Sequence, residues 1–208
     1  RLIRDGQRVV VGAYAGDLDG NLWKFDLSST SPTSWNASFS GNSLFRAVDA
    51  SNNPRPIVAP PIFVPHPGGG NLVMFGTGKL YEEGDQVNTQ VQALYGVWDR
   101  QVLEYQAGGA VGWSAGSRIT DMNTIVSQRF ETDVVAGSGG ASFYRVVSEN
   151  VNWSVHRGWT LPLTLAPGHR NLITPMALGG FVRFETMAPS ETGVVNPCDD
   201  SSGGVGYN

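Results

Sequence analysis

Asp17, Asp19 and Asn21 are the residues whose types and spacing come nearest to a metal-binding loop. Their alternate spacing places side-chain oxygens on one side of a curved backbone, which is the arrangement that Ca²⁺ requires. The EF-hand pattern then fails, because leucine and serine stand where glycine and glutamate are needed at its sixth and twelfth positions. Asp19-Gly20 between two alternating runs is instead a strong signal for a hairpin. We expect a turn here and retain the three residues as metal candidates.

A second group of residues matches the order of a hydrolase triad. Residues 112–116 fit G-x-S-x-G with Ser114 as the nucleophile, and Asp133 and His156 follow it in the α/β-hydrolase order. The nucleophile elbow requires a strand before the serine and a helix after it, whereas residues 117–120 read as turn and strand. We therefore predict a plain turn at Ser114 and no catalytic residues.

Three further groups have simpler structural interpretations. Residues 75–79 carry a Gly-x-Gly-Lys sequence but lack the spacing and the following helix of a phosphate-binding loop, so we expect a turn that ends a strand. A small acidic patch, which could bind a cation, is predicted to be a solvated loop: Glu82, Glu83 and Asp85. The histidines lie far apart in sequence and are predicted to be surface or packing residues: His66, His156 and His169.

The composition favours one domain built from many short strands. The 208 residues include 27 glycines and 12 prolines but only 15% charged residues. Net charge is −4 without a basic block, which argues against a nucleic-acid partner, and no apolar run is long enough to form a transmembrane segment. The chain begins at Arg1 without a methionine, so we expect a piece of a longer protein. Cys198 is the single cysteine, and a disulfide partner would have to come from outside this chain.

A weak internal repeat organises the chain. Predicted strands run into glycine at Gly16, Gly76 and Gly137, and the Leu-Trp-Lys-Phe run at residues 22–25 is matched in residue type 121 positions later. The middle copy is interrupted by an insertion over residues 79–92. Loops inserted at strand junctions frequently carry function, so we single out this insertion.

The repeat predicts an all-β fold, namely a modified, partial β-propeller with roughly three to four blades. No segment has convincing helical periodicity, and the whole chain, residues 1–208, is expected to be part of a single propeller domain. A β-sandwich is the structural alternative, but it would not predict the 121-residue register. Further strands are predicted at Trp35 to Phe39, Gln101 to Tyr105, Arg118 to Phe130 and Phe181 to Thr186.

Seven segments keep a distinctive order along the chain. They are Tyr14 to Leu27, Leu44 to Ala47, Arg55 to Pro61, Phe75 to Lys79, Leu94 to Asp99, Arg157 to Trp159, and Pro197-Cys198 followed by a glycine-rich turn. In this order they resemble the C-terminal domain of the PilC/PilY family of type IV pilus tip proteins. The first segment and the Gly-Thr-Gly-Lys element are the most specific in combination.

This resemblance implies a modified β-propeller that is exported and found at the outer membrane, the cell surface or the pilus tip. It implies a non-enzymatic module for pilus biogenesis, retraction control and tip-associated adhesion, which acts through loop-mediated protein binding. Minor pilins or other pilus machinery are the implied partners, with a host surface protein as a further one. Some members bind calcium through an aspartate-rich loop, but here Arg4 to Arg8 lacks the alternating carboxylates. Calcium therefore remains an expectation for the full-length protein only.

The alternative function is enzymatic, namely a fragment of a quinoprotein (PQQ-type) dehydrogenase propeller. Such blades use short Gly-x-Leu-aromatic strands ahead of a tryptophan, and Trp35 after Leu27 is compatible with this. The docking pattern of those blades needs Thr-Gly between aspartate and tryptophan, which residues 26–29 do not supply. The sequence therefore favours the pilus module over the enzyme.

Overall fold

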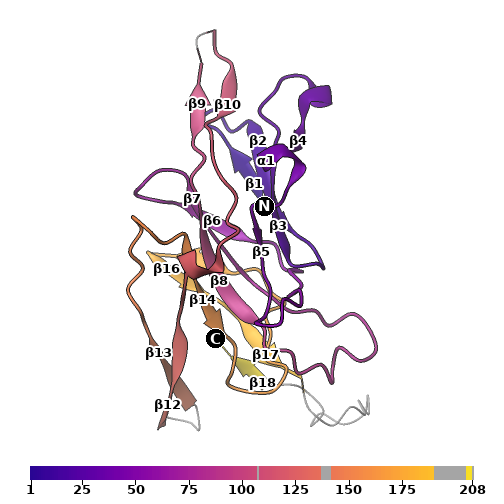
Figure 1. Ribbon diagram of the computed structural model, residues 1–208, viewed down its shortest axis with the longest axis vertical. Helices are drawn as coiled ribbons and strands as arrows, with labels where there is room; N and C mark the ends of the chain where they lie inside the picture. Colours follow the sequence, from indigo (N-terminus) through magenta and orange to yellow (C-terminus); the bar gives the residue numbers. More distant parts are fainter. Residues whose placement is uncertain (107, 137–141, 190–204, 208) are drawn as a thin grey trace.

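The computed structural model describes residues 1–106, 108–136, 142–189 and 205–207 of the chain (Figure 1). Its described residues are mostly strands and turns, which confirms the all-β prediction. The short helical elements are η1 (Pro32–Ser34), α1 (Ser38–Gly41) and η2 (Met122–Thr124). Within the described residues, no helix combines the length and the apolar character needed to cross a membrane.

The first sheet is formed by the N-terminal strands in the order β1-β2-β3-β4, and β5 also pairs with β3. These strands are β1 (Leu2–Arg4), β2 (Val10–Gly16), β3 (Asn21–Asp26), β4 (Asn36–Ala37) and β5 (Phe45–Arg46). All their pairings are antiparallel, with Tyr14 opposite Lys24 in the β2–β3 hairpin. Along β3, Leu22 and Lys24 are buried while their neighbours are partly exposed, so the alternation in the sequence does reflect a sheet with one covered face.

The second sheet has the order β11-β14-β8-β7-β6. Its strands are β6 (Ile62–Pro65), β7 (Asn71–Gly76), β8 (Ala93–Asp99), β11 (Ile125–Ser127) and β14 (Gly158–Pro162). Every residue of the central strand β8 is buried, because both faces of this strand are covered. The pair β11–β14 is parallel and the other pairs are antiparallel.

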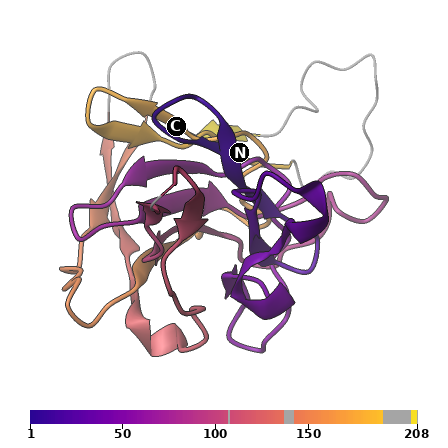
Figure 2. The same ribbon diagram turned by 90° about the horizontal axis from the view of Figure 1, so that it is seen from above.

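Four two-stranded ribbons complete the described fold. Their strands are β9 (Leu103–Tyr105) with β10 (Val111–Trp113), β12 (Arg129–Ala136) with β13 (Ser142–Val147), β15 (Met176–Leu178) with β16 (Phe181–Arg183), and β17 (Thr186–Ala188) with β18 (Val205–Tyr207). The β9–β10 ribbon projects at the top of Figure 1. Figure 2 shows the first sheet and the β12–β13 ribbon at opposite sides of the molecule.

The predicted repeat corresponds to three antiparallel hairpins. Its copies are β2–β3, β7–β8 and β12–β13, and the predicted insertion is the connection between β7 and β8. The first two hairpins lie in five-stranded sheets, whereas the third pairs with no other described strand. Gly137, the third predicted junction, lies outside the described residues.

The four additional strands are shorter than predicted. Where residues 35–39 were expected to be extended, β4 covers two residues and α1 follows, with positive φ angles at Phe39 and Ser40. Residues 101–105 contain only β9, and residues 181–186 are divided between β16 and β17.

The prediction of a strand over residues 118–130 was wrong in most of its length. The segment contains a backbone bridge from Ile119 to Phe45 and the helical turn η2. Only the short β11 and the first two residues of β12 are strand, as predicted. The carboxylate of Asp121 accepts a hydrogen bond from the Asn123 N–H and so stabilises η2. Such local side-chain hydrogen bonds compete with strand pairing, and apolar alternation does not reveal them.

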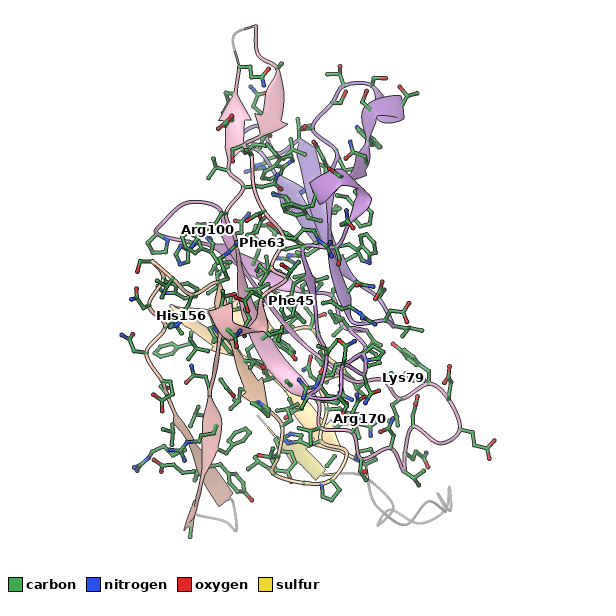
Figure 3. All side chains as sticks on the ribbon, viewed as in Figure 1. Phe45, Phe63, Lys79, Arg100, His156 and Arg170 are labelled. Atoms are coloured by element: carbon green, nitrogen blue, oxygen red, sulfur yellow. The ribbon has the colours of Figure 1, made fainter. Side chains whose placement is uncertain are left out.

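An aromatic cluster forms the centre of the core between the two sheets. The rings of Phe75 and Tyr95 stack with centroids 5.2 Å apart, and Phe45 from the first sheet packs against Tyr95 at 5.4 Å. All three side chains are almost fully buried. The labelled Phe45 lies at this junction of the sheets in Figure 3. Burial of these rings is the main apolar contribution to the association of the sheets.

A buried ion pair crosses the same junction. Lys24 Nζ on β3 lies 2.7 Å from Asp99 Oδ2 at the end of β8, and neither side chain is more than 1% exposed. Tyr14 donates its hydroxyl proton to the same oxygen at 2.6 Å, and the Lys24 ammonium lies 3.6 Å from the centre of the Trp113 ring. Burial lowers the pKa of Lys24 although Asp99 partly offsets this, and burial together with the Asp99 charge raises the pKa of Tyr14.

Glycine at position 70 permits the close approach that places Asp99. Gly70 has φ +68°, and a Cβ there would overlap the carbonyl oxygen of Asp99. The glycine thus satisfies both the left-handed turn after β6 and the packing against the end of β8.

Replacing Asp99 should destabilise the fold, because the buried Lys24 would lose its counter-ion. We expect Asp99→Asn to lower the free energy of unfolding by about 3 to 5 kcal/mol, because Lys24 then keeps its charge in a dry site without a counter-ion. Urea denaturation followed by tryptophan fluorescence measures the change. Adding Lys24→Met to Asp99→Asn should restore a large part of the lost free energy of unfolding. If the destabilisation of the double variant equals the sum of the destabilisations of the two single variants, this explanation is contradicted.

Buried histidine should make the fold sensitive to mild acid. His169 is 1% exposed, and burial lowers its pKa to about 4, whereas the unfolded chain titrates near 6.5. The unfolded state therefore binds more protons, so stability is complete above pH 6.5 and falls as pH approaches 4, by at most about 1.4 kcal/mol per pH unit. Denaturation of wild type and His169→Gln between pH 7 and 4.5 tests this. An equal pH slope in both proteins would exclude His169 as the cause.

Candidate functional site

The insertion between β7 and β8 is the strongest candidate for a functional site. It leaves the second sheet after Gly76 and returns at Ala93, and it extends from the body of the molecule at the lower right of Figure 1. Its outer part exposes two large side chains, Tyr81 at 73% and Val87 at 63%. We call residues 79–92 the insertion loop.

Buried Arg170 anchors one side of the insertion loop. Its guanidinium donates to the carbonyl oxygens of Lys79 at 2.6 Å and Asn88 at 2.7 Å, and its Nε donates to Gly168 O at 2.7 Å. Figure 3 shows Lys79 and Arg170 close together at the base of the loop. One side chain therefore joins the first and the later part of the loop to the segment that precedes β15.

Arg55 and Gln90 anchor the other side. Arg55 donates from Nε to Val91 O at 2.7 Å, and from a terminal nitrogen to the Tyr95 hydroxyl at 2.7 Å. The Gln90 amide donates to Asp49 Oδ2 at 3.0 Å. Hydrogen bonds from the side chains of Gln90 and Asn53 and from backbone N–H groups keep the pKa of Asp49 well below its usual range. The loop is thus attached to segments that precede and follow it in the chain.

Asp85 organises the interior of the insertion loop. Its Oδ2 accepts hydrogen bonds from the N–H groups of Tyr81 and Glu82, and its Oδ1 lies 3.2 Å from Lys79 Nζ. Burial opposes ionisation of Asp85, but these hydrogen bonds and the lysine lower its pKa. The prediction of a solvated acidic patch was wrong for Asp85, which is 4% exposed, and is confirmed for Glu82 and Glu83.

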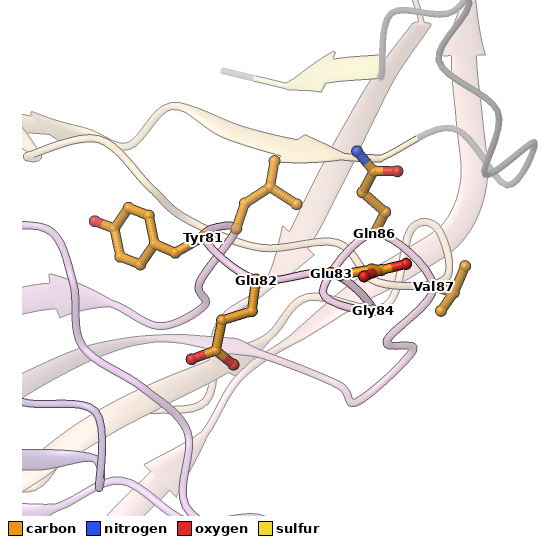
Figure 4. Close-up of a pocket in the computed structure, with 7 residues that line it drawn as sticks. Tyr81, Glu82, Glu83, Gly84, Gln86 and Val87 are labelled. Carbon is orange, nitrogen blue, oxygen red and sulfur yellow. The ribbon is translucent and has the colours of Figure 1, made fainter.

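The outer face of the loop is concave. It holds a hollow of about 570 Å³. Figure 4 shows the residues that line it: Leu80, Tyr81, Glu82, Glu83, Gly84, Gln86 and Val87. The lining combines apolar side chains with carboxylates and contains neither a nucleophile nor a histidine. Such a surface suits protein recognition, in which apolar and aromatic contacts are surrounded by polar groups.

The three predicted metal candidates form a turn. Asp17 Oδ1 accepts hydrogen bonds from the N–H groups of Asp19 and Asn21, and Oδ2 accepts from the Asn21 amide and from Trp23 Nε1. Burial of Asp17 is outweighed by these hydrogen bonds, so its pKa is lowered. The hairpin prediction is confirmed, with Gly20 at φ +77°, but Asp17 stabilises the turn while Asp19 is exposed.

The same aspartate turn recurs twice. Asp49 accepts from the N–H groups two and four residues later, as Asp17 does, and Asp5 accepts from Gln7 and Val9 in the same way. The residue with positive φ is Asn52 in one and Arg8 in the other. Asp5 belongs to the segment in which the family resemblance places a calcium loop in some members. In this chain its carboxylate accepts backbone hydrogen bonds and stabilises the turn between β1 and β2. In the part of the chain that the structure describes, no three His, Cys, Asp or Glu residues form a group suited to a metal ion.

The remaining candidates occupy structural positions. Ser114 follows β10 and precedes irregular chain rather than a helix, and its Oγ accepts a hydrogen bond from the Val102 N–H at 2.9 Å. His156 Nδ1 accepts from the Asn152 N–H, and the side chain of Asp133 lies outside the described residues. Ser114 therefore lies in irregular chain, where no turn is assigned, and the helix of a nucleophile elbow does not follow it.

Two of the three histidines pack as predicted. His66 stacks on Trp98 with ring centroids 4.0 Å apart, and His169 is buried. Trp35 is 48% exposed, and its indole N–H donates to Ser29 O. Cys198 lies outside the described residues.

Comparison with known protein families agrees with this architecture. The family model described as the PilY1 beta-propeller domain matches residues 2–123, which is more than half of the chain. The chain belongs to the PilY1 family. The matched residues include the first sheet, the insertion loop and strands β6, β7 and β8 of the second sheet, so the loop is part of a PilY1 propeller segment.

Named relatives and a solved structure extend the match. The type IV pilus biogenesis factor PilY1 of Pseudomonas aeruginosa is 33% identical over 231 residues, covering 91% of this chain and 19% of the relative. A PilY1 homolog of Xylella fastidiosa is 29% identical over 195 residues, covering 89% of this chain and 12% of the homolog. The crystal structure of the P. aeruginosa PilY1 C-terminal domain superposes with a TM-score of 0.76 at 30% identity, covering 90% of this chain and 43% of that one. The chain spans about a fifth or less of the length of these curated relatives.

Asp17 offers a test of the turn against the metal site. We expect Asp17→Asn to lower the free energy of unfolding by about 2 kcal/mol, because one of the two accepting oxygens becomes an NH2 group. Either the backbone N–H groups of Asp19 and Asn21 or the side chains of Asn21 and Trp23 then lose their acceptor. Millimolar calcium should leave the thermal midpoint of both proteins unchanged. A calcium-dependent rise in the wild-type midpoint that Asp17→Asn removes would restore the metal interpretation.

Proposed function

We propose that this chain is the propeller segment of a type IV pilus biogenesis factor and acts without catalysis, by presenting the insertion loop to another protein of the pilus machinery. The observation that carries the proposal is an exposed, concave loop anchored by buried arginine on a PilY1-family propeller. The relatives named above are type IV pilus biogenesis factors, which supports pilus biogenesis as the process.

Preorganisation of the loop supports a docking role. Arg170 and Arg55 restrain both sides of the loop before any partner binds, so association would cost less conformational entropy than ordering a free loop of this length. Tyrosine is enriched among residues that dominate binding energy at protein interfaces, and Tyr81 is the most exposed side chain of its size on the loop. The exposed carboxylates of Glu82 and Glu83 favour a partner with a basic rim.

Minor pilins are the proposed partners, and a host surface protein is a second one for tip-associated adhesion. This proposal requires the protein to be exported and to reside at the outer membrane, the cell surface or the pilus tip. It assigns no cofactor to the described residues, and calcium would act only through other parts of the full-length protein.

A double substitution at the loop tip tests the proposal. In a bacterium deleted for the gene, the full-length protein with Tyr81→Ser and Val87→Ser should restore several-fold fewer surface pili than wild type at equal protein level, because the apolar contacts are lost. Electron microscopy and sheared-pilin blots measure piliation, and attachment to host cells measures adhesion. The matched control is Val9→Ser with Leu18→Ser, two side chains that are 55% and 54% exposed in the connections before and after β2.

Two outcomes would contradict the proposal. Normal piliation and adhesion with the tip variant would exclude the loop as the docking element. A bound chromophore after addition of the quinone with calcium would instead support the dehydrogenase alternative. Arg170→Ala removes the anchor of the loop but keeps the exposed side chains of Tyr81 and Val87. It should therefore reduce piliation less than the tip variant does, which separates the effect of anchoring from that of the contacting side chains.

A further inference from the structure

The Asn-x-Ser/Thr acceptor pattern of N-linked glycosylation occurs twice in this chain. The two triplets are residues 36–38 and residues 152–154. Such triplets are frequent by chance, so the pattern alone does not identify a modification site. The structure places the two triplets in different surroundings, and only one of them is arranged to receive a sugar.

The side chains of Asn152 and Ser154 meet in an exposed turn. Asn152 Oδ1 accepts hydrogen bonds from the Ser154 N–H at 3.1 Å and from the Ser154 hydroxyl at 2.7 Å. Both residues are exposed, and no described residue accepts a hydrogen bond from Asn152 Nδ2. The amide nitrogen is therefore accessible, while the serine of the same triplet holds the amide oxygen.

The turn is held in one conformation by its neighbours. The carbonyl oxygen of Asn152 accepts hydrogen bonds from the N–H groups of Val155 at 3.1 Å and His156 at 2.7 Å. The Asn152 N–H in turn donates to His156 Nδ1 at 2.9 Å. Trp153, the middle residue of the triplet, packs against His66 with ring centroids 4.6 Å apart. Because the turn is already ordered, little conformational entropy is lost when a transferase binds it.

The triplet at residues 36–38 lacks these features. Asn36 Nδ2 already donates to the carbonyl oxygen of Ser34 at 2.9 Å. Ser38 is 6% exposed, and its hydroxyl is buried without a hydrogen-bond partner among the described residues. It therefore does not hold the Asn36 amide. This triplet matches the pattern in sequence alone and provides an internal negative control.

We propose that Asn152 is a glycosylation site at which a sugar is joined to Nδ2. The donor is an activated sugar phosphate, whose anomeric carbon carries a phosphate leaving group. The bond between Nδ2 and the anomeric carbon forms as the bond between that carbon and the phosphate oxygen breaks. Nδ2 loses one proton, and the phosphate leaves as the anion. The hydrogen bond from the Ser154 hydroxyl to Oδ1 polarises the amide and makes this proton more acidic.

The proposed site lies away from the insertion loop. In Figure 3, the labelled His156 lies at the opposite side of the view from Lys79 at the base of the loop. A sugar on Asn152 therefore leaves the loop uncovered. Asparagine-linked sugars occur on surface loops of secreted proteins, so the site rests on the export required by the proposed function but not on the docking role of the loop.

Mass spectrometry of the full-length protein, purified from its own bacterium, tests the site. Trypsin releases Asn152 in the peptide 146–157 and Asn36 in the peptide 25–46. We expect the first peptide to carry the added mass of one or more sugar residues, located on Asn152 by electron-transfer fragmentation, and the second peptide to carry none. An unmodified Asn152 would overturn the proposal, and so would equal modification of Asn36. The docking role of the loop is measured separately, as piliation.

Three variants separate the acceptor pattern from the rest of the turn. Ser154→Ala keeps Asn152 but removes the hydroxyl, so it should abolish the added mass, whereas Ser154→Thr should preserve it. The matched control is Asn150→Gln, because Asn150 is an exposed asparagine of the same peptide outside the triplet, and it should leave the modification unchanged. Full modification of Ser154→Ala, or loss of the added mass in Asn150→Gln, would contradict the proposal.

Discussion

The buried contact between Lys24 and Asp99 is the interaction on which the arrangement of the two sheets depends. It joins the middle of β3 to the end of β8 across 75 residues of sequence, and Tyr14 and Trp113 complete its surroundings. An isolated charge in this place would be very costly, so both strands must meet in one register. The aromatic core supplies most of the apolar burial between the sheets. Apolar contacts would still form if one sheet shifted along the other, whereas the Lys24–Asp99 ion pair would be broken by such a shift.

The position of the insertion loop follows from this junction. The loop leads directly into β8, whose other end carries Asp99, so the strand that forms the ion pair also fixes where the loop returns to the sheet. Arg55 and Arg170 then connect the loop to segments on either side of it in sequence. A segment that would otherwise cost entropy to order is thereby presented as a shaped surface.

Local signals predicted the fold class and the hairpins well. Asp19-Gly20 indicated a turn, and the structure has a turn there. Residues 22–25 lie in β3, the second strand of the first hairpin, and the matching residues 121 positions later lie in β13, the second strand of the β12–β13 hairpin. The strand predicted over residues 118–130 was wrong because side-chain hydrogen bonds within a few residues, such as that of Asp121, compete with pairing. The buried position of Asp85 was missed because its charge and its acidic neighbours are typical of a solvated loop.

The sequence by itself determined an all-β chain of hairpins and its membership of a pilus-associated family, because turn chemistry and strand alternation are properties of neighbouring residues. Only the tertiary structure decided that Lys24 and His169 are buried and that Arg170 anchors a loop 91 residues earlier. Each of these depends on contacts between residues far apart in the chain. A polar residue has the same sequence signal whether it is solvated or paired in the core, and the difference arises only when folding supplies its partner.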